Sequence, residues 1–70
     1  PLTGARKIAY DALVGLGGSA HIDLWRDAAY SAGITASSER EAKKKAFQRA
    51  VAGLRSGAYV ETKDDYWWSK

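Results

Sequence analysis

The chain has 70 residues, of which 46% are hydrophobic and 27% charged, and its net charge is +3. This composition is typical of a small globular domain and excludes a disordered segment. The absence of Cys excludes disulfides and thiolate sites, and no apolar run reaches the roughly 18 residues that a membrane span requires. We therefore expect one domain over residues 1–70, without membrane association. Because the chain has no Met and begins at Pro1, we expect it to be excised from a longer protein.

The first half of the chain predicts a helix, a short strand and a second helix. Thr3 is a suitable N-cap for the first helix, and apolar residues recur at helical spacing until Gly17-Gly18 ends it. Residues 20–22 suffice only for a short edge strand. Asp23 is expected to cap a helix over residues 24–32. The residues of this helix expected to face inward or to pack between helices are Leu24, Trp25, Ala28 and either Ala29 or Ala32.

Residues 38–56 predict a third helix that carries the positive excess of the whole chain. Six Lys and Arg stand there against two Glu, a balance of +4. Ser38 and Glu41 have the spacing of a capping box, and Gly57 is expected to close the helix. An apolar stripe at helical spacing predicts the buried face; its members are Phe47, Ala50, Val51 and Leu54, and Ala46 lies beside it.

Two β-prone runs follow, residues 58–62 and 66–69, and predict a hairpin that turns at residues 63–65. The order helix, short strand, helix, helix and hairpin is that of a winged helix-turn-helix. The predicted fold class is therefore α+β and mostly α, with three helices, a short strand and a C-terminal β-hairpin.

The length of the hairpin loop decides which aromatic side chains face outward. With a three-residue loop, Val60 opposes Trp68 and faces the core, and Tyr59 and Trp67 lie on the outer face. A two-residue loop reverses this arrangement. Exposed aromatic rings could stack on an unpaired base or bind a protein, but covering a small core is the favoured role.

The third helix is the candidate contact with nucleic acid. Lys and Arg neutralise phosphates and release counterions, and Gln and Arg can hydrogen-bond base edges in the major groove. The main contacts are predicted at Lys44, Lys45, Gln48 and Arg49, with Ser38, Arg40, Lys43 and Arg55 supporting them. A solvated helix face is the alternative for a lysine run. Concentration of the charge excess on the third helix favours nucleic acid, with duplex DNA preferred to single strands.

Other features predict what the chain does not do. Asp64 and Asp65 make the hairpin tip acidic, so we expect this wing not to enter a DNA groove deeply. His21 is the only histidine, and no set of metal ligands accompanies it. No catalytic triad, phosphate-binding glycine loop or pair of catalytic carboxylates can be assembled. We expect no metal, no cofactor and no enzymatic activity in this chain.

A set of residues along nearly the whole chain resembles one known module. They are Leu2-Thr3, Ala12-Leu13, Gly17-Gly18, Trp25-Arg26, Ala46-Phe47-Gln48-Arg49-Ala50, Leu54, Gly57, Val60 and Tyr66-Trp67-Trp68. The module is the C-terminal winged-helix domain of phage- and plasmid-encoded replicative ATPases of the RecA-like helicase type. The resemblance implies a role in DNA replication in the cytoplasm of a bacterial or phage-infected cell, with ATP hydrolysis in a preceding domain. The acidic hairpin tip departs from the usual DNA-contacting wing.

The alternative function is a protein-interaction module of the same fold. It would dock a replication partner, such as a helicase or primase, through Tyr59, Trp67 and the basic helix. Binding to DNA should weaken steeply as salt rises, whereas docking through aromatic side chains should depend on salt only slightly.

Overall fold

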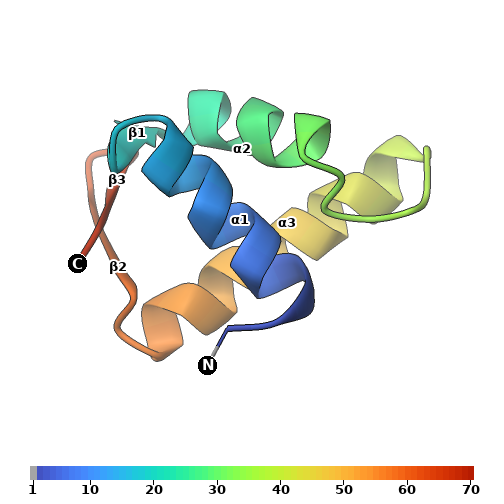
Figure 1. The fold of residues 1–70 in the computed structure, drawn as a ribbon. Helices are drawn as coiled ribbons and strands as arrows, with labels where there is room; N and C mark the ends of the chain where they lie inside the picture. Colours follow the sequence, from blue (N-terminus) through green and yellow to red (C-terminus); the bar gives the residue numbers. More distant parts are fainter. Residues whose placement is uncertain (1) are drawn as a thin grey trace.

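Three helices and a three-stranded antiparallel sheet form a mostly helical α+β fold (Figure 1). The computed structural model describes residues 2–70. In chain order the elements are α1 (Gly4–Gly15), β1 (Ser19–His21), α2 (Ile22–Ser31), α3 (Arg40–Ser56), β2 (Val60–Lys63) and β3 (Tyr66–Ser69). The predicted order of helices, short strand and hairpin is confirmed. None of the helices within residues 2–70 is long and apolar enough to cross a membrane.

The core lies where α1 packs against both other helices and the sheet closes one end. Trp25 occupies its centre and is fully buried, as the sequence predicted. Its indole Nε1 donates a hydrogen bond of 2.8 Å to the carbonyl oxygen of Ala9, which joins α2 to α1. Its ring meets Phe47 of α3 edge to face at 5.3 Å and Trp67 of β3 at 5.6 Å. This one side chain therefore joins α2 to α1, α3 and the central strand of the sheet.

The phase of α2 differs from the prediction at one position. Leu24 was expected to face inward, but 55% of its surface is exposed. Trp25 and Ala29, four residues apart and both fully buried, define the inner face instead. Since the Trp25 indole is fixed by its hydrogen bond to α1, the neighbouring Leu24 is turned toward solvent.

The predicted N-caps of α2 and α3 are wrong. The helix α2 begins at Ile22, and the ring Nδ1 of His21 accepts a hydrogen bond of 3.1 Å from the backbone N–H of Asp23. The helix α3 begins at Arg40 after Glu39, without a side-chain cap hydrogen bond. The expected Ser38 cap does not form. The Ser37 hydroxyl oxygen instead accepts a hydrogen bond of 3.1 Å from the N–H of Glu39, and this local turn precedes the first residue of the helix.

The end of α3 is built by two residues with different roles. Gly57, the predicted stop, has an ordinary φ of −84°. Ala58 takes the left-handed conformation, with φ of 63°, and the next N–H, that of Tyr59, bonds to the carbonyl of Leu54 at 2.9 Å. Glycine is needed at 57 for space, since a Cβ there would lie 2.9 Å from the Tyr59 ring.

The sheet has the order β1-β3-β2, so the C-terminal strand is central (Figure 1). Lys63 pairs with Tyr66, so the hairpin loop contains two residues, and the three-residue alternative is wrong. Asp64 and Asp65 both have positive φ, 51° and 67°, as a type I′ turn requires. Val60, the first residue of β2, is buried. Because the loop has two residues, Val60 pairs with Ser69 rather than with Trp68.

Candidate nucleic-acid interface

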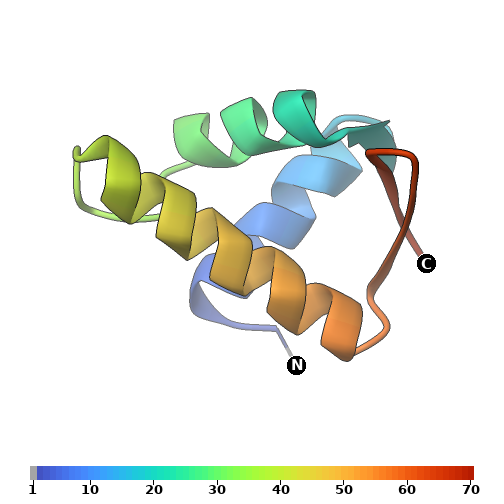
Figure 2. The same ribbon diagram turned by 180° about the vertical axis from the view of Figure 1, so that it is seen from behind.

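The helix α3 separates apolar from charged residues around its axis. Its buried residues are Phe47, Ala50, Val51 and Leu54, which confirms the predicted apolar stripe. The side chains that sequence analysis assigned as main contacts are all exposed; they are Lys44, Lys45, Gln48 and Arg49. Figure 2 shows α3 in front of α1, so the face of α3 that carries these side chains points away from α1. The geometry therefore presents the predicted contact face outward.

The cations of α3 are distinguished by their lack of carboxylate partners. Ion pairs elsewhere on the surface join Lys7 to Asp11 at 2.9 Å and Lys70 to Glu61 at 3.3 Å. Among residues 2–70, by contrast, none of the six Lys and Arg of α3 lies within ion-pairing distance of a carboxylate. The positive potential of this helix is therefore not cancelled locally, which is the condition for attracting a polyanion.

The supporting residues of the prediction occupy different environments. Arg55 and Arg40 are exposed near opposite ends of α3. Lys43 is half-buried and places its Nζ 5.9 Å from the centre of the Tyr30 ring, so part of its contact area faces the protein. Ser38 is exposed ahead of the helix, outside its first turn.

A further cation, Arg6 of α1, lies beside α3. Its guanidinium passes over Gly53, where an added Cβ would come within 2.5 Å of the Arg6 Nε. Arg6 is exposed and has no ion pair among the described residues. The position of Arg6 beside α3 was not predicted from the sequence. The available signal was Gly53 in the middle of a basic helix, because a glycine lets a side chain from another element approach the helix backbone closely.

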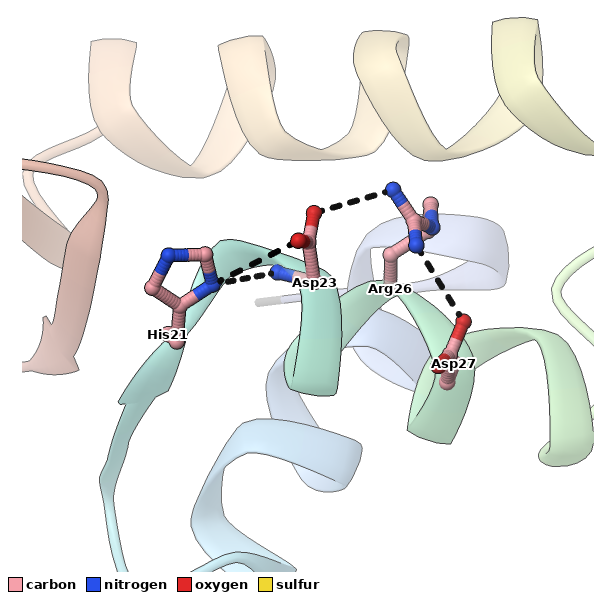
Figure 3. Close-up of polar contacts among 4 residues, drawn as sticks. All are labelled: His21, Asp23, Arg26 and Asp27. Carbon is pink, nitrogen blue, oxygen red and sulfur yellow. Dashed lines mark hydrogen bonds and ion pairs between the residues drawn. The ribbon is translucent and has the colours of Figure 1, made fainter.

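The start of α2 carries a small network of polar side chains (Figure 3). Arg26 extends toward α3 and bonds to Asp23 at 3.1 Å and to Asp27 at 3.5 Å. The Asp23 carboxylate also lies 3.8 Å from His21 Nδ1. Two carboxylates thus offset the charge of Arg26, unlike the charges of α3.

The two aromatic residues predicted to share an outer surface do not do so. Trp67 faces the core, where it packs against Trp25, so its predicted outward position is wrong. The reason is the two-residue turn, which shifts every side chain of β3 to the other face. Tyr59 is exposed, and its ring packs edge to face on Tyr10 at 6.1 Å. The outward aromatics of the sheet are instead Tyr66 and Trp68, which are 56% and 36% exposed.

The described residues contain no group of three or more His, Cys, Asp or Glu side chains placed to hold a metal ion.

Comparison with protein-family models, curated proteins and solved structures finds no significant match to this chain. The arrangement of charge and apolar surface on α3 is therefore the structural basis for assigning a binding role.

Proposed function

We propose that this chain is a winged helix-turn-helix domain that binds duplex DNA through the exposed face of α3. The observation that carries the proposal is a helix with six Lys and Arg, none paired with a carboxylate among residues 2–70, whose opposite face is buried. In this assignment α2 and α3 form the helix-turn-helix and the β2–β3 hairpin is the wing. An α-helix fits the major groove of B-DNA, which favours duplex over single strands.

Different positions along α3 would have different tasks. Lys45 and Arg49, one turn apart on the outermost face, would contact phosphates or base edges. Gln48, exposed on one flank of this face, would make the bidentate contact to adenine that its amide permits. The wing would stay outside the groove, because Asp64 and Asp65 are exposed at its tip and repel phosphates.

The setting that we propose is replication of a phage or plasmid in the cytoplasm of a bacterial cell. This part of the proposal is supported only by the sequence resemblance described above, which no family model, curated protein or solved structure supports. The chain would supply DNA binding, without catalysis of its own, and the parent protein would supply ATP hydrolysis.

The test is a fluorescence titration of labelled duplex DNA with the chain at two salt concentrations. The variant Lys45→Glu/Arg49→Glu should bind at least about tenfold more weakly, and its plot of log affinity against log salt should be less steep by about 2. Single-stranded DNA serves as the competitor that tests the preference for duplex.

The matched control is Lys7→Glu/Lys70→Glu. It changes the net charge by the same amount, at two exposed lysines that pair with carboxylates away from α3. Its affinity should stay near that of the parent chain. Equal weakening of both double variants would show a response to net charge only, and the α3 interface would be rejected.

A further inference from the structure

A groove of about 730 Å³ lies between α2, α3 and the hairpin. Figure 2 views the molecule from the side on which α2 and α3 are in front and α1 lies behind them. The residues that line the groove come from α2, α3 and β3, and none comes from α1. A groove of this size is within the range of ligand-binding clefts.

The floor of the groove is apolar and fixed in place. Its apolar residues are Ile22, Tyr30, Phe47, Val51 and Trp67. Phe47 and Val51 are buried members of the core, and the other three are half-buried and pack against it. The Tyr30 ring meets the Phe47 ring at 6.2 Å, and Trp67 leans on Trp25 at 5.6 Å. The apolar surface is therefore preformed and does not depend on a partner for its shape.

The rim of the groove is cationic. Lys44, Gln48 and Arg55 line it from α3, and Arg26 lines it from α2. Lys44 and Arg55 are exposed and have no ion pair within residues 2–70, whereas Arg26 is held between Asp23 and Asp27. A ligand that lies along α3 consequently meets two uncompensated positive charges beside an apolar floor.

We infer that this groove binds an amphipathic acidic helix of a protein partner. The apolar side chains of such a helix, spaced i, i+3, i+4 and i+7, would lie on Phe47, Val51 and Trp67, and its Glu or Asp residues would face Lys44 and Arg55. Charge complementarity with the rim selects an acidic partner over a basic one. Duplex DNA does not satisfy this site, because its surface of phosphates and base edges offers little to cover an apolar floor.

This inference is independent of DNA binding, but the two surfaces share part of α3. Lys44, Gln48 and Arg55 belong both to the rim and to the predicted DNA contact. A partner helix and duplex DNA would therefore compete, and occupancy by one would release the other.

The experiment titrates the isotope-labelled chain with a synthetic 18-residue amphipathic peptide and follows it by NMR. The peptide carries Leu at four positions spaced i, i+3, i+4 and i+7 and Glu on the opposite face; the control peptide has Lys in place of every Glu. The acidic peptide should shift the signals of Ile22, Val51 and the Trp67 indole, and bind on the order of tenfold more tightly than the basic peptide. A single-stranded oligonucleotide is titrated in parallel.

Two double variants of α3 distinguish the contribution of the rim charges to peptide binding from the contribution of the other charges on this helix. Lys44→Glu/Arg55→Glu should weaken binding of the acidic peptide by about tenfold, since two attractions become repulsions. Lys45→Glu/Arg49→Glu changes the net charge equally, outside the groove, and should bind the peptide within about threefold of the parent chain. Both variants alter exposed side chains, so the fold should persist, and the NMR spectrum reports it.

Three results would overturn the inference. The acidic peptide could fail to bind at millimolar concentration, or it could shift the signals of Tyr66 and Trp68 on the outer sheet face instead of those of the groove. The oligonucleotide could bind in the groove where the peptide does not.

Discussion

The two faces of α3 contribute to the molecule in different ways. On the inner face Phe47 and Leu54 are buried in the core. Burial of each such side chain stabilises the fold by about 1.5–3 kcal/mol. On the outer face Lys45 and Arg49 are exposed to solvent. Solvated cations add almost nothing to stability, and like charges along one helix oppose it slightly. The fold therefore does not require the charged side chains of the outer face.

The largest expected effect comes from breaking the inner face. Phe47→Ala should lower the free energy of unfolding by about 3–5 kcal/mol, because the ring contacts both Trp25 and Tyr30 and its loss leaves a cavity. Urea denaturation followed by circular dichroism measures it. Gln48→Ala, at the adjacent exposed position, should change stability by less than about 0.5 kcal/mol. If the two variants were equally stable, the assignment of the faces would be wrong.

Substitutions at the C-terminal end of α3 should change the free energy of unfolding less, and they test the helix cap rather than either face. Ala58→Gly should raise the free energy of unfolding by about 0.5–1 kcal/mol, since glycine adopts the positive φ of 63° without strain. Gly57→Ala should act in the opposite direction, because its Cβ would meet the Tyr59 ring at 2.9 Å. Thermal melting of the two single variants checks the pair. A loss of stability in Ala58→Gly would contradict the observed cap.

The smallest effect tests whether the acidic wing tip opposes the outer face of α3. Asp64→Asn/Asp65→Gly keeps residues that favour the two positive φ angles and removes two negative charges. Affinity for duplex DNA should rise about threefold, and its salt dependence should steepen as Lys63 comes into contact. Titrations like those used for α3 provide the measurement. Unchanged affinity with an unchanged salt slope would mean that the tip points away from the DNA.

Sequence reasoning succeeded where one local pattern determined the outcome. The apolar stripe of α3 fixed its phase, so the burial of Phe47 and the exposure of Lys45 were both predictable. The element order followed in the same way from turn residues and periodicity. The burial of Trp25 was predictable because a domain of 70 residues needs its large side chains inside.

The failures came where two local solutions were nearly equivalent. Lys63-Asp64-Asp65 permits loops of two or three residues, and only packing of Trp67 against Trp25 distinguishes them. The cap of α3 was predicted wrongly for a similar reason. Ser37 and Ser38 can each accept a hydrogen bond from a nearby backbone N–H, and their spacing does not show which of them does so. The groove was not predictable at all, since it results from how α2, α3 and the hairpin pack together.

The junction between β1 and α2 has a consequence for the thermodynamics of association. β1 passes into α2 without a loop, and the N–H of Ile22 donates a hydrogen bond of 2.8 Å to the carbonyl of Asp65 at the hairpin turn. The turn is thereby attached to the first residue of α2. Little conformational entropy is then lost when a ligand contacts the helices and the hairpin together. The association rate should accordingly follow diffusion and electrostatic steering rather than a slow rearrangement of the chain.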